Sequence, residues 1–328
     1  MKTTKATGTT FSDLVSAAGL NFEPELQAMF LADGSMVDGK NAVVRPMANG
    51  ERQVLGVVGA RYVPTSYATI GETLDAPGAE GEPSLGSLVT PHSAIEFGGG
   101  AKVVLQGRIN GGEVDLISPR NGRIGVAAFI SAVGSLDGSS GLSLLPSGHC
   151  IVCKNTLALA VARDVWKMST KHTAGGQARF VGYVRAVAAA LAAFRVKAEA
   201  YQRMVNTPLS EAGFRTYIET VFPARSAVEQ VLEATPATPS CTVADILGET
   251  EAQATGHRGK LVSALLDAYE SAPGAEPGTV WGAYQAATHY LTHTAGRGEE
   301  ARAHSLTFGP NRARVELAEA TAVRLLAR

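Results

Sequence analysis

Several features that define common protein classes are missing from this chain of 328 residues. No run of 18 or more apolar residues occurs, and the polar start lacks the basic-then-apolar pattern of a signal peptide, so we expect neither membrane spanning nor secretion. Three cysteines are too few for a disulfide framework. These absences together predict a cytoplasmic protein.

Charged residues are also scarce. Asp, Glu, Lys and Arg make up 18% of the chain, against about 25% in an average globular protein, whereas 36 residues are glycine. Small residues or other subunits must then cover much of the surface, which favours assembly into a homo-oligomer. The net charge of −1 gives the whole protein no attraction for nucleic acid or anionic lipid.

The few charges are distributed unevenly along the chain. Residues 145–206 carry nine basic and two acidic side chains, whereas residues 1–144 carry 10 basic and 14 acidic ones. A local excess of seven positive charges is typical of a segment that follows a phosphate backbone. The alternative is a long helix with surplus arginine on a solvated face.

The first part of the chain has the pattern of an antiparallel β-sheet. Short apolar runs alternate with turn residues, and Asp-Gly or Asn-Gly pairs favour hairpins because glycine tolerates a positive φ. Helices are expected at Phe11–Ala18 and Ser66–Leu74, and turns at Asp33-Gly34, Asp38-Gly39 and Asn49-Gly50. The expected strands are Glu25–Leu31, Ala42–Pro46, Gln53–Val58, Ala94–Phe97, Lys102–Ile109, Val114–Ile117, Gly125–Val133 and Leu142–Cys153.

Helical periodicity replaces this pattern near Asn155. Asn155 or Thr156 is predicted to cap a helix over Leu157–Lys167, directly after the last strand. From Phe180 to Val205 apolar residues recur in steps of four and three, which predicts a long helix whose apolar seam packs against later helices or another subunit. Further helices are expected at Glu211–Phe222, Val243–Glu270, Val280–His293 and Arg312–Ala327.

The predicted fold class is therefore α+β. An antiparallel β-meander with a packed helix, a β-β-β-α-like core, is expected to form a β-rich domain over residues 1–175. A helical domain is expected over residues 176–328, with oligomerisation as its role. The strand–helix junction between them carries the basic segment.

Residues suited to catalysis or metal binding give weak patterns. Cys150 and Cys153 are expected on one strand, where positions three apart point to opposite faces, and this favours buried apolar roles over metal or redox chemistry. His289 and His293 have a spacing that suits a shared metal, but no carboxylate or third ligand accompanies them. No glycine-rich phosphate loop, nucleophile elbow or paired carboxylates occur, so we expect no cofactor, no metal and no enzymatic activity.

The basic segment is the strongest candidate site. Trp166, Phe180 and Tyr183 are interleaved with its cations, and cations with planar side chains suit sequence-tolerant binding of single strands, although large aromatics at helical spacing are more often core. The predicted nucleic-acid-binding residues are Lys154, Arg163, Lys167, Lys171, His172 and Arg179, with Lys102, Arg108, Arg120 and Arg123 on the preceding hairpins extending the same face.

An ordered set of short phrases resembles a phage/plasmid-like protein family of unknown function, found on bacterial prophages, phages and plasmids. The chain departs from that family at Lys154, where a neutral or small residue is usual, and at Lys171, where arginine is typical. The phrases are Ala18-Gly19-Leu20-Asn21-Phe22, Val43-Val44-Arg45, Leu55-Gly56-Val57-Val58-Gly59 with Arg61-Tyr62, Asp137-Gly138-Ser139-Ser140, Cys153-Lys154-Asn155-Thr156-Leu157, Lys171-His172-Thr173, Thr279-Val280-Trp281-Gly282-Ala283-Tyr284 and Phe308-Gly309.

More distantly, a meander followed by a helix with cations at the junction is similar to the core of the single-strand annealing recombinase superfamily. That resemblance implies rings or filaments that hold single-stranded DNA in a basic groove, and fold likeness alone does not fix function. We hypothesise a phage- or plasmid-encoded protein of the bacterial host cytoplasm that binds and anneals single-stranded DNA in recombination. The alternative is a non-enzymatic interaction module of a mobile element, a replication accessory or anti-defence protein with phage or host replication proteins as partners.

Overall fold

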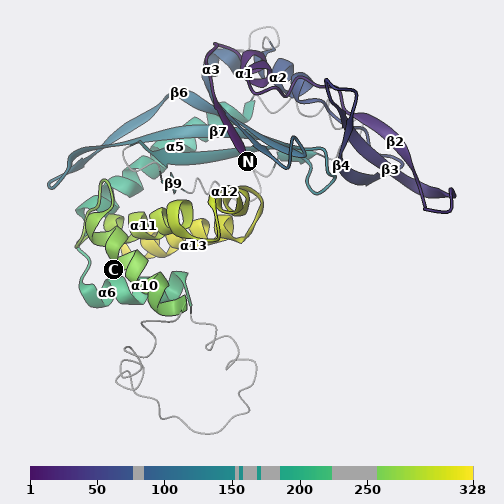
Figure 1. Cartoon of the computed structure of the whole chain (residues 1–328). Helices are drawn as coiled ribbons and strands as arrows, with labels where there is room; N and C mark the ends of the chain where they lie inside the picture. The colour runs from purple at the N-terminus through teal and green to yellow at the C-terminus, as the bar shows by residue number, and fades with distance from the viewer. Residues whose placement is uncertain (77–84, 152–154, 158–167, 171–184, 224–256, 328) are drawn as a thin grey trace. The chain divides into compact units, whose positions relative to one another are not determined.

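A computed structural model describes residues 1–76, 85–151, 155–157, 168–170, 185–223 and 257–327. In these residues two antiparallel sheets precede helices that lie mostly in the C-terminal half (Figure 1). This arrangement confirms the predicted α+β class. Among the described helices, none has the length and apolar character needed to cross a bilayer.

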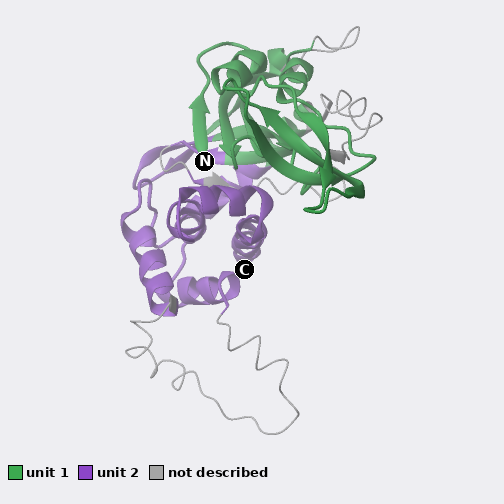
Figure 2. Cartoon of the chain, turned by 45° about the vertical axis from the view of Figure 1, so that its right-hand side comes forward, with its two compact units in different colours: residues 1–114, 127–148, 159–196 green, residues 115–126, 149–158, 197–328 purple. Residues whose placement is uncertain are grey.

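The chain divides into two compact units, each assembled from three segments (Figure 2). Unit 1 comprises residues 1–114, 127–148 and 159–196, and unit 2 comprises residues 115–126, 149–158 and 197–328. The predicted domain boundary after residue 175 lies outside the described residues, so it stays a prediction.

The larger sheet has the strand order β1-β5-β6-β7-β8-β10, with β9 also paired to β8. Consecutive strands from β5 to β8 are neighbours, as in the predicted meander. Two strands were expected within β6, but Gly111 adopts a φ of 70° inside one continuous strand, as glycine does in a bulge. The strands are β1 (Lys2–Lys5), β5 (Val89–Phe97), β6 (Lys102–Ser118), β7 (Gly122–Ser135), β8 (Leu142–Cys150), β9 (Thr156–Leu157) and β10 (Met168–Thr170).

A smaller sheet in unit 1 has the order β2-β3-β4, formed by β2 (Glu25–Phe30), β3 (Met36–Pro46) and β4 (Arg52–Gly59). Gly34 and Gly50 adopt φ values of 83° and 82°, which confirms the predicted turns there. The turn predicted at Asp38-Gly39 is wrong, because Gly39 lies within β3 and uses its φ of 69° inside the strand.

The first two helices of unit 1, α1 (Phe11–Ala17) and α2 (Tyr67–Asp75), confirm the expected positions, whereas the short helix α3 (Leu85–Leu88) was not anticipated. Thr10 and Asp13 form a capping box at the start of α1. Asp75 adds a second cap, since its carboxylate accepts the backbone amides of Phe11 at 2.7 Å and Ser12 at 2.8 Å. The negative charge therefore meets the positive end of α1 and joins the two helices.

The remaining helices follow the predicted order with two differences. The helix predicted to start at Leu157 is wrong at its beginning, because Leu157 belongs to β9, and residues 158–167 lie outside the described part. A helix over 299–308 was not anticipated. The helices are α5 (Arg185–Asn206), α6 (Glu211–Val221), α10 (His257–Ser271), α11 (Val280–His289), the π-helix η2 (Tyr290–Thr294), α12 (Glu299–Phe308) and α13 (Pro310–Leu325).

Aromatic side chains form the core of unit 2. Tyr201 on α5 packs against Trp281 and Tyr284 on α11, with ring centroids 5.3 and 5.9 Å apart. Its hydroxyl donates to buried Glu319 on α13 at 2.7 Å, and Lys197 pairs with the same carboxylate. The predicted seam is thus confirmed for Ala198, Tyr201 and Val205, and around Tyr201 it closes within the chain.

Candidate nucleic-acid interface

Six of the ten predicted DNA-contacting residues lie outside the part that the structure describes, as do Trp166, Phe180 and Tyr183. Their roles therefore stay predictions. The four other residues belong to β6, β7 and the turn between them. The residues outside the description are Lys154, Arg163, Lys167, Lys171, His172 and Arg179.

Two of the described cations, Lys102 and Arg108, lie in unit 1 and already have carboxylate partners. Lys102 lies 3.4 Å from Asp137, with both side chains largely buried. Burial raises the pKa of Asp137, but hydrogen bonds from Ser139 and Ser135 and the Lys102 charge outweigh it, so the pKa lies below its ordinary value. Arg108 pairs with Glu113 at a more exposed position. We therefore expect Lys102 to contribute least to phosphate binding.

The turn between β6 and β7, residues 118–123, lies in unit 2, and its backbone is held by hydrogen bonds. The hydroxyl oxygen of Ser118 accepts the backbone amides of Arg120 and Asn121 at 3.0 and 2.9 Å. Gly122 follows with a φ of 69°, which few other residues adopt at low cost. Local hydrogen bonds and a glycine conformation thus contribute to the shape of this turn.

A buried carboxylate anchors this turn to the segment between α10 and α11. Glu276, 3% exposed, accepts the Ser118 hydroxyl and the side-chain amide of Asn121, the latter at 2.6 Å. The same amide donates to the carbonyl of Ala275 at 2.9 Å. Hydrogen bonds to a charged acceptor contribute about 1.5–3 kcal/mol each, so Glu276 holds the turn firmly.

Helix α5 supports the β6 side of the turn. The side chain of Gln202 accepts the amide of Ile117 at 2.7 Å and donates to its carbonyl at 2.9 Å, as a neighbouring strand would. Sequence analysis identified the arginines of the turn but missed the supports Gln202 and Glu276. The Asn121-Gly122 pair is a turn signal that was not used, and the two supports carry no local signal because they lie far away in the sequence.

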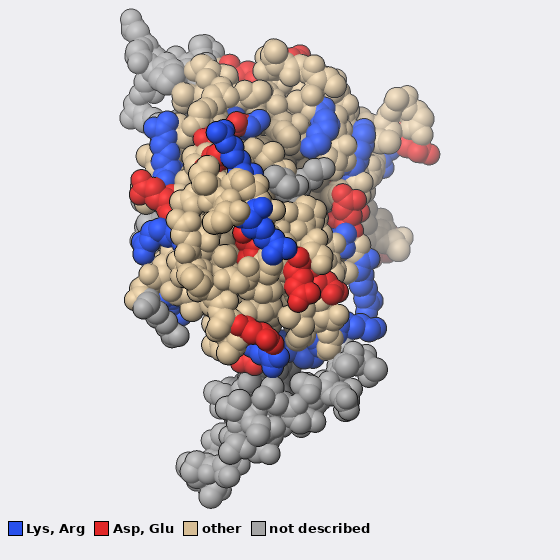
Figure 3. Space-filling view, turned by 90° about the vertical axis from the view of Figure 1, so that its left-hand side faces the viewer, with Lys and Arg blue, Asp and Glu red and all other residues tan. Residues whose placement is uncertain are grey.

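These supports hold two arginines in solvent. Arg120 is exposed, and Arg123 is 78% exposed and lies 3.4 Å from Asp115. An exposed ion pair contributes only about 0–1 kcal/mol, so a phosphate can replace Asp115 at little cost. Figure 3 shows Lys and Arg interspersed with Asp and Glu on the face that it presents. On that face the described cations therefore form local sites and no broad basic surface.

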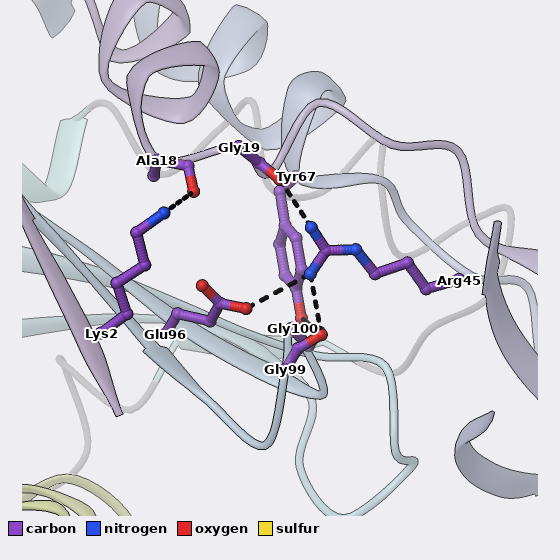
Figure 4. A network of polar contacts seen from close by, with 8 residues as sticks. All are labelled: Lys2, Ala18, Gly19, Arg45, Tyr67, Glu96, Gly99 and Gly100. Atoms are coloured by element: carbon purple, nitrogen blue, oxygen red, sulfur yellow. Dashed lines mark hydrogen bonds and ion pairs between the residues drawn. The ribbon is translucent and has the colours of Figure 1, made fainter. Parts of the chain in front are cut away.

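Arg45 in unit 1 shows the opposite use of an arginine (Figure 4). Its guanidinium donates to the carbonyls of Gly99 and Gly19, each at 2.9 Å, and lies 3.3 Å from the Glu96 carboxylate. The ring centre of Phe22 lies 4.4 Å from the guanidinium carbon. These contacts join β3 of the smaller sheet to β5, to the β5–β6 turn and to the segment between α1 and β2, and they leave little of Arg45 for a ligand.

Further close contacts lie in unit 1, and one of them joins two phrases of the family resemblance. Tyr67 donates its hydroxyl to the Gly100 carbonyl at 2.7 Å, and burial raises the pKa of Tyr67, so the proton stays in place. Gly56 faces the backbone of Asp137 so closely that a Cβ there would clash. The phrases that include Gly19, Arg45, Gly56 and Asp137 thus mark structural contacts.

Asn155 is a buried hydrogen-bonding residue, and its side chain does not cap a helix as predicted. Its amide donates to the Gln285 side chain at 2.6 Å, and its oxygen lies 3.1 Å from Nε2 of His293. Thr156 belongs to β9, so it caps no helix there either. Buried tertiary hydrogen bonds determine the conformation here, since an unpaired amide inside the protein is costly.

The two histidines and the described cysteine show no metal site. The rings of His289 and His293 lie 4.7 Å apart between centroids, but among the described residues no three His, Cys, Asp or Glu side chains stand together as ligands. Burial and the neighbouring His293 lower the pKa of His289. Cys150 is buried, as predicted, and Cys153 lies outside the description.

Comparison with protein-family models places this chain among uncharacterised relatives. Residues 54–318 match the model described as Domain of unknown function (DUF932), which covers well over half of the chain and both units. Comparisons with curated proteins and with solved structures give no match. The chain therefore belongs to the DUF932 family, and its function has to be inferred from its own residues.

Proposed function

We propose that this protein binds single-stranded DNA and promotes the annealing of complementary strands without covalent chemistry. The β6–β7 turn carries the proposal, because the buried Glu276 and the partly exposed Gln202 fix a backbone that holds Arg120 and Arg123 in solvent. Arginine forks match phosphate geometry, and a fixed backbone lowers the entropy lost on binding. The excess of seven positive charges over residues 145–206 is a second source of cations for phosphate binding.

Annealing requires contacts to the phosphates of a strand that leave its bases free to pair. Arginines that neutralise phosphates hold a strand without occupying the hydrogen-bonding edges of its bases, so a complementary strand can still pair. Several weak contacts become a stable complex when subunits are linked, because linkage raises the effective concentration. The resemblance to phage and plasmid proteins and to annealing recombinases supports recombination of a mobile element in a bacterial host as the setting.

Fluorescence anisotropy with a labelled 30-nucleotide strand tests the binding. The logarithm of the affinity should fall linearly with the logarithm of salt concentration, by about 0.7 for each phosphate neutralised. The double variant Lys167→Glu/Lys171→Glu should bind at least tenfold more weakly. The control Arg215→Glu/Lys260→Glu changes the net charge equally at exposed residues outside the basic segment and should bind like the wild type.

Absent or salt-insensitive binding would contradict the proposal, as would wild-type affinity in the Lys167→Glu/Lys171→Glu variant. Annealing needs its own readout, the energy transfer between donor and acceptor dyes on two complementary strands. The protein should accelerate the signal for complementary strands and leave non-complementary strands unpaired. Binding without acceleration would restrict the function to strand protection.

The second candidate is a non-enzymatic interaction module, and one observation favours it. Large apolar side chains are exposed at eight positions between residues 26 and 63. Exposed apolar patches often mark protein contacts. Strong binding of a protein partner together with no binding of any oligonucleotide would favour this candidate over the first.

A further inference from the structure

His92 lies at an irregularity of strand β5 in unit 1. The register of β5 against β6 shifts between Pro91 and Ser93, so His92 is the extra residue of a bulge. Bulges re-aim a side chain and are frequent beside functional sites. Strand β1 fixes the backbone at this point, because the His92 carbonyl accepts the backbone amide of Ala6 at 2.9 Å.

Two side chains hold the imidazole ring of His92. Its centroid lies 5.1 Å from the ring centroid of Phe129 on β7, in an edge-to-face contact. On β1, the Nζ atom of Lys5 lies 3.3 Å from Nε2 of His92. An ammonium group can only donate, so Nε2 accepts, and the ring is neutral with its proton on Nδ1.

Arg108 on β6 adds a second positive charge to this ring. It lies opposite Thr90, two residues before His92. Burial of the ring, followed by the charges of Lys5 and Arg108, lowers the pKa of His92 below its ordinary value. Glu113 pairs with Arg108. Basic side chains from three adjacent strands, together with one carboxylate, therefore form a cluster.

Water reaches this cluster. Lys5 is exposed, His92 is partly exposed, and the Arg108 side chain is 40% exposed. Two cations beside an imidazole disfavour its protonation, and polar contacts at exposed positions contribute little to folding. The arrangement is therefore better suited to an anion than to stabilising the sheet.

We propose that Lys5, His92 and Arg108 bind a tetrahedral oxyanion with two negative charges, of the chemical class of phosphate monoesters. A phosphoryl group of this kind carries a charge of about −1.5 to −2 at pH 7 and three strong acceptor oxygens. The cluster offers one donor side chain on each of three adjacent strands and two permanent positive charges. A carboxylate has only two oxygens and one charge, so it matches the cluster less well.

The anion changes the role of His92. When an oxygen approaches, Lys5 donates to that oxygen in place of the ring, and Nε2 takes a proton from the buffer and donates as well. Binding is therefore coupled to proton uptake. Glu113 has to release Arg108, so its carboxylate competes with the ligand.

Histidine NMR of the whole protein with sulfate, without DNA, tests the site. Sulfate stays a dianion while histidines titrate, and chloride keeps the ionic strength constant. Sulfate should raise the pKa of His92 by about 1, because an opposite charge in hydrogen-bond contact favours the protonated ring. His92→Gln assigns the signal by its loss, and His304 on α12 is the internal control. An unchanged pKa of His92, or an equal rise for His304, would overturn the proposal.

Three variants measure which charges matter. Lys5→Gln/Arg108→Gln should weaken sulfate binding at least about tenfold, since two charge-assisted hydrogen bonds are lost. The control Lys40→Gln/Arg61→Gln removes the same charge from exposed residues of unit 1 and should bind sulfate like the wild type. Glu113→Gln frees Arg108 and should bind sulfate several-fold more tightly. Wild-type affinity in Lys5→Gln/Arg108→Gln, or no gain in Glu113→Gln, would contradict the site.

The end of a DNA strand and a small phosphate ester are two sources of such a group. Anisotropy compares strands labelled at the 3′ end that carry a 5′-phosphate or a 5′-hydroxyl. Tighter binding of the phosphorylated strand that is lost in Lys5→Gln/Arg108→Gln supports the site with a strand end as its ligand. Equal binding of both strands, with the sulfate effect on His92 present, supports it with a small phosphate ester.

The site is independent of the proposed function. The sulfate effect on His92 should persist in Arg120→Ala/Arg123→Ala, whose substitutions lie at the β6–β7 turn in unit 2. A protein that binds no single strand but shows the sulfate effect would overturn the proposed function and support this site. A protein that binds single strands without any sulfate effect would do the opposite.

Discussion

Arg45 and Arg120 have the same side chain and opposite surroundings. Arg45, in unit 1, is 20% exposed and meets two carbonyls, a carboxylate and an aromatic ring. Arg120, in unit 2, lies on a turn whose backbone, rather than its side chain, is held by the fold. The difference teaches that the environment of an arginine, and not its number in a segment, decides whether it stabilises the fold or is available to a ligand.

The largest expected effect is a loss of stability on removing Arg45. Arg45→Ala leaves Glu96 and the carbonyls of Gly19 and Gly99 without their donor, at a cost of about 2–4 kcal/mol in the free energy of unfolding. Urea unfolding measures it, and Arg120→Ala is the matched control, with less than about 0.5 kcal/mol expected at a surface position. Equal stability of the two variants would remove the contrast between the arginines.

Glu276 is itself buried, but its hydrogen bonds hold the turn that carries the exposed Arg120 and Arg123. Glu276→Ala leaves Ser118 and Asn121 without their acceptor and should destabilise the protein by about 1–3 kcal/mol. The affinity for a single strand should also fall several-fold, because the turn loses its fixed backbone. A stable, fully binding variant would show that the anchoring is irrelevant to binding.

Removing the charge of Asp115 tests whether Arg123 is available to a ligand. Its ion pair with Arg123 is exposed, so Asp115→Asn should leave stability within about 0.5 kcal/mol and strengthen single-strand binding a few-fold at low salt. Glu211→Gln is the matched control, since it frees Arg215 of α6 with the same change in charge. Equal strengthening by both variants would indicate a general charge effect in place of a site at the turn.

The smallest expected effect concerns pH and the Lys102–Asp137 pair. The folded state holds the pKa of Asp137 below its ordinary value of 3.8, so the unfolded chain binds more protons as the pH falls. The contribution to stability is therefore complete well above pH 3.8 and is lost as the pH falls from 3.8 through the lower pKa of the folded state. Thermal unfolding from pH 6 to pH 3 should show a shallower loss of stability in Asp137→Asn, and an identical loss would contradict the role of this carboxylate.

Local patterns predicted much of the fold. Apolar spacing located α1, α2, α6 and the described part of the α5 seam, and the turns predicted at Gly34 and Gly50 were correct. The turn predicted at Gly39 was wrong, because a glycine with a positive φ fits a strand irregularity as well as a turn. The helix predicted to start at Leu157 does not start there, because Leu157 belongs to β9, which pairs with β8.

The candidate site was only half predictable for a physical reason. Arg120 and Arg123 are visible beside a turn signal, but the acceptor that fixes the turn is more than 150 residues away. No spacing rule links Ser118 to Glu276, since the hydrogen bond exists only after both elements have packed. Arg45 shows the same limit, because its carbonyl partners carry no side-chain signal.

The salt dependence of single-strand binding tests the central claim most directly. In Arg120→Ala/Arg123→Ala the slope of log affinity against log salt should be shallower than in wild type by about 1.4, or about 0.7 for each phosphate that is no longer neutralised. Arg45→Lys, which keeps the charge within unit 1, should keep the wild-type slope. A wild-type slope in the Arg120→Ala/Arg123→Ala variant would contradict a phosphate site at the β6–β7 turn.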